Sequence, residues 1–512
     1  GVDAVHGHAS VRGATVFPHN IGLGAAGSPD LVERTGRAAA AEMQATGVRW
    51  TFGPTVAVPQ DIRWGRTYEG FGRDPALVSK LAAASVRGLQ GHTGEPPSVL
   101  ACAKHFVGDG ATAWGTAPRL DFVDWWDGWG DAWQMDQGDA RISEEALRSV
   151  HLAPYRAAVD AGVMTVMASY SSWNGVKLHA HGYLLTDVLK GELGFEGFVV
   201  SDWMGVDQIA PGYEDSLVTA INAGVDMVMI PIDYPRFIDA MKSIVSDGRI
   251  PIGRIDAAVR RILTVKHRAG LFDEEWDQPP LDVLGSEEHR SLAGEAVRRS
   301  AVLLKNDGAL PLSSTPAWLE VAGSAADDIG LQCGGWTVGW QGAAGPVTEG
   351  TTLLEGVRSA FPEARFHPEG RFPEEARSGV GIVCIGERPY AEGPGDCAIP
   401  EPTQHDRAVF ARMRARSEKL ILIVYSGRPL LMPDLVAQAD AVIAAWLPGS
   451  EGAALVDLLV GAQRFEGRSP QPWPQAPSDF GDDRARPLFG VGHGLDIRTS
   501  VPPTHLEPEE RS

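Results

Sequence analysis

The sequence predicts an α/β fold of two domains, the first of them a (β/α)8-like TIM barrel. Through the first half of the chain, short β-rich runs alternate with helical runs, and polar residues stand at the junctions. The alternation lapses in an acidic, proline-containing segment after residue 270 and then resumes. Alternation of this kind predicts parallel sheets, and a chain of 512 residues is too long for one ordinary core.

The predicted strands of the first half are short apolar runs that end at polar residues. A helix is predicted from Pro29, with Ser28 as its N-cap and Gly47 as its stop signal. In barrels of this kind the chemistry lies where the strands end. The strands are predicted at residues 48–52, 98–103, 163–169, 197–201 and 225–230.

The second half begins after a predicted helix at residues 254–270 and a linker rich in acidic residues and proline. Further strands are predicted at residues 317–323, 379–386, 420–427 and 441–449, which indicates a second α/β domain. The predicted boundaries are a barrel at 1–273, a linker at 274–289, the second domain at 290–496 and a loose tail at 497–512.

Composition narrows the classes of partner. A formal charge of −21 disfavours nucleic acid and anionic membrane surfaces, because phosphate binding depends on clustered Lys and Arg. No apolar run approaches the roughly 18 residues that predict a membrane span. Four cysteines without CxxC spacing are too few for a disulfide framework, and the first residues carry no signal-peptide pattern.

Two histidine pairs raise the question of a metal. His6/His8 and His179/His181 have the spacing of residues that share one face of a strand, and Lys104 and an aspartate are available as further ligands. This pattern favours a metal-dependent barrel hydrolase as one alternative, although it leaves the second domain without a role. The other interpretation is that Asp3, just before the first pair, holds an uncharged ligand and that no metal is needed.

Three carboxylates are candidates for a catalytic pair. Asp202 directly follows a predicted strand and has Trp203 beside it, so it could attack a sugar's anomeric carbon or simply cap the next helix. Glu387 and Glu392 lie in a loop of Gly and Pro after the strand at 379–386. They are either exposed loop charges or, if the loop reaches the barrel mouth, the source of a second catalytic carboxylate.

The combination of motifs resembles family three glycoside hydrolases, and within them the β-glucosidase and β-glucan exohydrolase branch. The resemblance runs in order from Gly1 to about Leu495. It rests on "DAVHGH", "DIRWGRTYEGF", "CAKHFVGDG", "MASYSSWNGVK", "GFVVSDW", "VLLKNDGALPL", "CGGWT", "GERPYAEGPGD", "SGRP" and "WLPGSEG". The resemblance implies a TIM-like barrel followed by an α/β sandwich domain, with a pocket between them.

The resemblance also implies a role for each candidate residue. Asp202 would be the nucleophile and Glu392 the acid/base of a retaining mechanism, which needs carboxyl groups about 5 to 5.5 Å apart. Tyr170 would lie beside the nucleophile, while Trp203 and Trp336 would clamp the following sugar. The remaining predicted residues would bind hydroxyls of the terminal sugar: Asp3, Arg66, Lys104 and His105. No cofactor and no metal is implied.

The implied activity is that of an exo-acting β-glucosidase or β-glucan glucohydrolase. Asp3, placed for the 4- and 6-hydroxyls, favours glucose over xylose, which lacks the outer hydroxymethyl arm. A β-xylosidase, a transglycosylating glucosidase and a sugar-binding protein without turnover stay open as alternatives. A periplasmic or secreted location is implied by the family only.

Two features depart from the family pattern. The chain starts at Gly1, where family members have a further strand and helix, so we expect either that the sequence is part of a longer gene product or that the barrel is incomplete and has an unpaired edge. Such an edge predicts low solubility or pairing with another chain, a homodimer being one form. The second feature is an insertion at residues 113–139, interpreted either as a sugar-stacking wall or as a self-packed loop or subunit contact. It carries five tryptophans, Trp114, Trp125, Trp126, Trp129 and Trp133.

Overall fold

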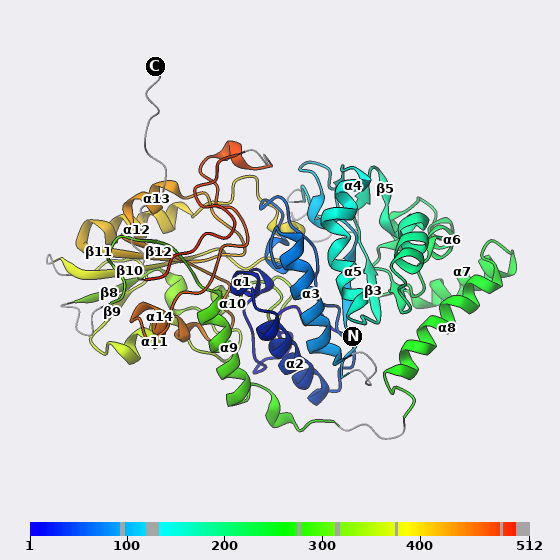
Figure 1. Ribbon diagram of the computed structural model, residues 1–512, viewed down its shortest axis with the longest axis horizontal. Helices are drawn as coiled ribbons and strands as arrows, with labels where there is room; N and C mark the ends of the chain where they lie inside the picture. Colours follow the sequence, from blue (N-terminus) through cyan, green and yellow to red (C-terminus); the bar gives the residue numbers. More distant parts are fainter. Residues whose placement is uncertain are drawn as a thin grey trace, which may run out of the picture.

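The computed structural model describes residues 1–92, 98–118, 133–273, 278–312, 318–373, 377–481 and 485–497. Figure 1 shows two α/β halves side by side, with the first half of the chain on one side and the sheet of the second half on the other. Trp125, Trp126 and Trp129 of the predicted wall lie outside the described residues, as do residues 274–277 of the predicted linker and 498–512 of the predicted tail.

The first half is a barrel-like arrangement of parallel segments. Its three regular strands pair in the order β1 (Cys102–Phe106), β3 (Thr165–Ala168) and β6 (Phe198–Val200). Single parallel bridges extend this row, from Val2 to Thr51, from Trp50 to Leu100 and from Val200 to Met227. Among the described residues, six parallel segments therefore lie side by side in the order in which they occur in the sequence: Val2, Trp50–Thr51, β1, β3, β6 and Met227.

Two of the predicted strands are shorter than expected. The segment 48–52 is bridged only at Trp50 and Thr51, and the segment 225–230 only at Met227. Pro54 follows the first of these segments and has no N–H to continue a ladder. A small three-stranded sheet lies apart from the barrel row: β2 (Asp139–Ala140), β4 (Ser172–Trp173) and β5 (Val176–Lys177).

The helices of the first half follow the predicted signals. In α2 (Pro29–Ala45) the Ser28 side chain accepts a hydrogen bond from the Leu31 N–H, as an N-cap does. The other α-helices are α1 (Asn20–Ala26), α3 (Pro75–Gln90), α4 (Glu144–Ala146), α5 (Ala153–Asp160), α6 (Tyr213–Ala223), α7 (Tyr234–Ser246) and α8 (Ile252–Arg268), and two π-helices span Leu147–His151 and Tyr183–Glu192. In Figure 1, α7 and α8 lie at the margin of the molecule, where apolar side chains such as Ile238 and Leu263 are exposed.

The second half contains a six-stranded sheet in the order β7-β12-β11-β10-β8-β9. The four predicted strands correspond to β8 (Leu319–Ala322), β10 (Ser378–Gly386), β11 (Ser417–Tyr425) and β12 (Ala441–Trp446), all parallel to their neighbours among these four. The prediction missed β7 (Val302–Asn306), which pairs antiparallel to β12, and β9 (Arg365–His367).

This sheet is covered on both faces, which makes the half an α/β sandwich. Alternate residues of its strands enter separate cores, Ile421 and Ile423 in one and Leu422 and Val424 in the other. Its helices are α9 (Glu287–Ser300), α10 (Ile329–Cys333), α11 (Leu353–Ala360), α12 (Gln404–Arg416), α13 (Pro433–Gln438) and α14 (Val456–Leu459). Among the described residues, none of the helices in either half is long and apolar enough to span a membrane.

The connection between the halves is docked against the barrel. The buried Glu42 of α2 accepts hydrogen bonds from the Gly285 N–H at 3.1 Å and the His289 ring at 2.9 Å. Gln278 donates to the Ala45 carbonyl at 2.8 Å. The described part of the predicted linker is therefore packed rather than free, which brings the second sheet against the barrel mouth.

Candidate active site

A cavity of about 380 Å³ lies between the two halves and is lined by residues of both. Its size falls in the range of small-molecule sites. All nine site residues predicted from the sequence line it: Asp3, Arg66, Lys104, His105, Tyr170, Asp202, Trp203, Trp336 and Glu392. The barrel contributes the first seven, and the second half contributes Trp336 and Glu392.

The barrel residues lie where its strands end, as the barrel geometry requires. Lys104 and His105 belong to β1, and Tyr170 follows β3 by two residues. Asp202 follows β6 by two residues. Glu392 reaches the same cavity on the loop that leaves β10.

Asp202 presents one unengaged carboxylate oxygen. Its Oδ1 accepts a hydrogen bond from the Trp203 N–H at 2.7 Å, while its buried Oδ2 has no hydrogen-bond partner. The Nε2 of His105 lies 3.6 Å from that Oδ2. Burial raises the pKa of Asp202 to about 6, although Arg66 and Lys104 lower it. The cations therefore reduce the effect of burial on the pKa without outweighing it.

Glu392 is held by a cation from the other half. Arg66 Nη1 donates to Glu392 Oε1 at 3.2 Å. Burial raises the pKa of Glu392 to about 7, Arg66 lowers it, and the charge of Asp202 raises it further. The pKa of Glu392 is therefore the higher of the two, which is the order that an acid and a nucleophile need.

Arg66 is itself held by a buried carboxylate that the sequence analysis did not single out. Glu69 is fully buried and accepts two hydrogen bonds of 2.9 Å from the Arg66 guanidinium. It also accepts one from Trp336 Nε1 at 3.1 Å. Glu69 lies inside the quoted "DIRWGRTYEGF" motif, and its spacing of three residues from Arg66 was the available signal.

Asp3 and Lys104 form an ion pair in the same cavity, with 2.8 Å between Asp3 Oδ1 and Lys104 Nζ. Burial lowers the pKa of Lys104, but Asp3 and Glu69 together outweigh it, so the pKa is raised. His105 Nδ1 lies 2.9 Å from Asp109 Oδ2, and burial together with Arg66 holds the pKa of His105 well below its usual range. The cavity therefore offers a cation, a carboxylate and a neutral imidazole, groups that can hydrogen-bond sugar hydroxyls.

The loop that carries Glu392 is fixed by a second carboxylate with no role assigned from the sequence. Asp396 Oδ2 accepts the backbone N–H groups of Gln134, Met135 and Asp136 at 2.9, 2.6 and 2.9 Å. Its Oδ1 accepts the N–H of Gly65 at 2.8 Å. One side chain thus ties the acid loop to the segment before Arg66 and to the end of the insertion.

Aromatic side chains form the remaining wall. Trp203 is 55% exposed, and the Tyr170 hydroxyl donates to its carbonyl. Of the two insertion tryptophans that the structure describes, Trp133 lines the cavity. Its indole packs directly against Gly393, where an added Cβ would meet it at 2.1 Å. Trp336 faces the same cavity. The sugar clamp by Trp203 and Trp336 stays a prediction.

Backbone strain is concentrated at this cavity. Seven described residues other than glycine have positive φ, and four of them line the cavity. These four are Gln137, Met204, Trp336 and Glu392. Such conformations cost free energy and persist where the surroundings enforce them, as they do at functional sites.

The histidines of the metal alternative have separate partners. His6 contacts the Phe17 carbonyl and the Thr337 hydroxyl, whereas His8 contacts Thr46. His179 Nε2 accepts the N–H of Asp202 at 2.9 Å. Across the described ranges, no three His, Cys, Asp or Glu side chains gather in a way that could hold a metal ion.

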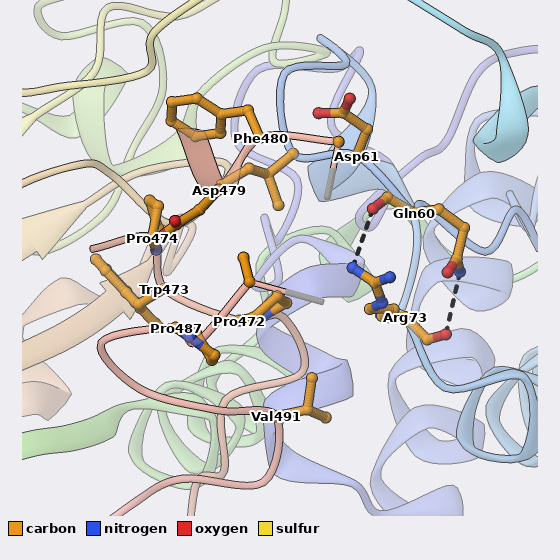
Figure 2. Close-up of a pocket in the computed structure, with 13 residues that line it drawn as sticks. Gln60, Asp61, Arg73, Pro472, Trp473, Pro474, Asp479, Phe480, Pro487 and Val491 are labelled. Carbon is orange, nitrogen blue, oxygen red and sulfur yellow. Dashed lines mark hydrogen bonds between the residues drawn. The ribbon is translucent and has the colours of Figure 1, made fainter. Parts of the chain in front are cut away.

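A second cavity of about 240 Å³ lies between the 60–73 loop and the C-terminal segment 472–491. Figure 2 shows that Gln60 and Arg73 are hydrogen-bonded to each other on one side of it, facing Trp473 and Phe480. None of the nine predicted site residues lines this cavity. Both candidate catalytic carboxyls, Asp202 and Glu392, line the first cavity instead.

The chain is similar to known glycoside hydrolases along most of its length. The N-terminal domain of glycosyl hydrolase family 3 matches residues 1–124 and 127–265, and the C-terminal domain of that family matches residues 301–497. The lysosomal beta glucosidase of Dictyostelium discoideum is 32% identical, over 98% of this chain and 64% of its own length. The periplasmic beta-glucosidase of Salmonella typhimurium is 29% identical, over 97% of this chain and 71% of its own length.

Solved structures agree with these matches. The exo-1,3/1,4-beta-glucanase from a Pseudoalteromonas species superimposes with a TM-score of 0.90 at 40% identity, covering 100% of this chain and 65% of that one. A beta-glucosidase from Listeria innocua, in complex with isofagomine, gives 0.83 at 26% identity, covering 96% and 72%. The chain therefore spans about two thirds of the length of such relatives. With both family domains matched in order, this chain belongs to glycosyl hydrolase family 3.

Proposed function

We propose that this chain is a retaining, exo-acting β-glucosidase or β-glucan glucohydrolase, which releases glucose from the non-reducing ends of β-glucosides and β-gluco-oligosaccharides. The observation that carries the proposal is that Asp202 from the barrel and Glu392 from the second half line one cavity and differ in pKa. The names of the relatives, which include beta-glucosidases and an exo-1,3/1,4-beta-glucanase, support the same activity.

In the proposed mechanism, the free Oδ2 of Asp202 attacks the anomeric carbon of the terminal sugar. The bond from that carbon to the glycosidic oxygen breaks, and Glu392 donates its proton to the departing oxygen. Glu392 then takes a proton from a water molecule, which displaces Asp202 from the anomeric carbon. Two inversions give net retention of configuration.

The polar residues of the cavity support recognition of a single terminal glucose. Asp3 and Lys104 are paired at 2.8 Å and would bind the outer hydroxyls, while Arg66 and His105 lie near the reacting carboxyls. A β-xylosidase is kept as the second candidate, because the relatives include a beta-xylosidase from Formosa agariphila at 28% identity. Relative rates on nitrophenyl β-glucoside and β-xyloside separate the two.

We infer further that residues 1–273 form the catalytic barrel, 274–289 the connection, 290–496 the sandwich domain and 497–512 a tail. A periplasmic or secreted location is supported by two relatives described as periplasmic. Formation of a homodimer stays a prediction, which light scattering of the purified chain tests.

The decisive experiment traps the covalent intermediate. A 2-fluoro-β-glucoside carrying a good leaving group should inactivate the protein and label the peptide that contains Asp202, as read by mass spectrometry. Asp202→Asn should remain unlabelled under the same conditions. A label on another residue would refute the assignment of Asp202. Loss of activity on treatment with a chelator, regained with zinc, would favour the metal-dependent hydrolase instead.

A further inference from the structure

Three hydrogen-bonded side chains form a row that ends at the active-site cavity. Lys177 Nζ donates to Gln208 Oε1 at 3.1 Å, and Gln208 Nε2 donates to Gln137 Oε1 at 3.2 Å. Gln137 lines the cavity and is only 5% exposed. None of these residues has a role in the mechanism described above.

The direction of this row is fixed by its first member. A lysine ammonium has only donors, so the Gln208 atom that faces it must be the carbonyl oxygen. The NH2 group of Gln208 therefore points toward Gln137, and the side-chain oxygen of Gln137 accepts its hydrogen bond. The NH2 group of Gln137 is left without an acceptor among the described residues. Burial lowers the pKa of Lys177 to about 8, so the lysine is a cation at neutral pH.

The row lies on the aromatic side of the cavity. Lys177 Nζ also donates to the Tyr170 carbonyl at 2.7 Å, and the Tyr170 hydroxyl contacts the Trp203 carbonyl. Gln137 follows Trp133, whose indole packs against Gly393 next to the proposed acid. A general acid protonates the leaving-group oxygen, so the leaving group must lie on its side of the cavity.

The backbone at Gln137 is held in place from the second half. Gln137 has a φ of 62°, in the left-handed region that a residue with a side chain adopts at a cost. The three residues before it are bound through their N–H groups to the Asp396 carboxylate. Asp396 belongs to the loop of Glu392, so the position of Gln137 is coupled to that of the acid.

We propose that the side-chain NH2 of Gln137 donates a hydrogen bond to a hydroxyl oxygen of the leaving-group sugar, which makes Gln137 a determinant of specificity. Its direction toward the sugar is set by Lys177 through Gln208. This inference rests on the proposed function and deepens it, since it concerns the second sugar of the substrate. An aryl leaving group carries no hydroxyl for this contact and does not benefit from it.

The first test is Gln137→Ala. The kcat/KM for cellobiose and laminaribiose should fall about tenfold, the effect of one lost hydrogen bond in a buried site. The kcat/KM for 4-nitrophenyl β-glucoside should change less than about twofold. An equal fall on all three substrates would overturn the proposal.

The second test reverses the direction of the hydrogen bond between residues 208 and 137 without replacing Gln137. In Gln208→Glu the new carboxylate accepts from Lys177 but has no N–H to donate, so the Gln137 amide must turn its NH2 toward residue 208. Its oxygen then faces the cavity, and the two disaccharides should lose about as much kcat/KM as in Gln137→Ala. Unchanged disaccharide kinetics in this variant would overturn the assigned direction.

The control is Gln438→Glu, the same change at an exposed position on α13, which should alter neither substrate class. Melting temperatures of all variants separate folding defects from specificity. If the unaltered chain hydrolyses no β-glucoside, the proposed function fails, and the Gln137 inference is then tested by calorimetric binding of cellobiose. Weaker binding by Gln137→Ala would support it, and equal binding would refute it.

Discussion

Arg66 Nη1, on a barrel loop, lies 3.2 Å from Glu392 Oε1, which the second half of the chain supplies. The same guanidinium is held by two 2.9 Å hydrogen bonds to Glu69. This hydrogen bond joins residues that are 326 positions apart in the sequence. The charge of the guanidinium acts on both proposed catalytic carboxyls. It lowers the pKa of both proposed catalytic carboxyls, whereas burial raises both.

The pH dependence of kcat/KM should be a narrow bell. Asp202 must be ionised and has a pKa of about 6, so activity falls as pH drops through that value. Glu392 must be protonated and has a pKa of about 7, so activity falls again above it. Because the groups are coupled, the two limbs belong to the pair. A profile that is flat from pH 5 to 9 would contradict these assignments.

Arg66→Met should move the bell to higher pH. Loss of the cation removes the influence that lowers both carboxyl pKa values, so both limbs should shift in the same direction. The variant should also lose about 3–5 kcal/mol of stability, because Glu69 stays buried without its partner. Arg66→Met combined with Glu69→Gln should recover much of that stability. Because the charge of Glu69 raises the pKa of Glu392, the upper limb of the profile should move less in the double variant than in Arg66→Met.

Asp202→Asn should be more stable than the unaltered chain at pH 7.5. The folded pKa of about 6 lies above the ordinary 3.8, so Asp202 contributes stability at low pH that is lost as pH rises through about 6. Asparagine keeps an oxygen for the Trp203 N–H and never ionises. Thermal unfolding should therefore show a gain of about 1–3 kcal/mol at pH 7.5 and little at pH 4. An equal difference at both pH values would exclude this cause.

Glu392→Ala should impair poor leaving groups far more than activated ones. Without the proton donor, kcat/KM on cellobiose should fall about 10³-fold, whereas a dinitrophenyl glucoside needs no protonation and should lose less than about tenfold in its first step. The control Glu418→Ala, at an exposed position of β11, should affect neither substrate. Equal losses on both substrates would remove Glu392 from the role of acid.

Asp396→Asn should uncouple the acid loop from the barrel. Four backbone N–H groups donate to the Asp396 carboxylate. In asparagine one of the two oxygens is replaced by an NH2 group, which cannot accept, so some of these bonds are lost. The kcat on cellobiose should therefore fall roughly tenfold or more. The matched control is Asp440→Asn. Asp440 also accepts a backbone N–H, that of Leu420 in β11, and neither residue lines the cavity. A similar loss of kcat in both variants would indicate a merely structural role.

Local patterns determined much of the architecture. The N-cap at Ser28 and the apolar runs of β10, β11 and β12 predicted elements that the structure contains, because hydrogen bonds within a helix or along a strand depend on neighbouring residues. The short strands β7 and β9 were missed, since their pairing depends on a sheet edge formed by residues far away.

For the active site, the sequence by itself determined which nine side chains to look for, and all nine line one cavity. Only the tertiary structure showed how these side chains are held. Glu69 accepts hydrogen bonds from Arg66, and Asp396 accepts them from Gly65 and residues 134–136. The direction of the hydrogen bonds that end at Gln137 likewise became visible only in the structure. The physical reason is distance along the chain. These contacts join residues up to several hundred positions apart, and their burial and pKa values exist only once both halves pack together.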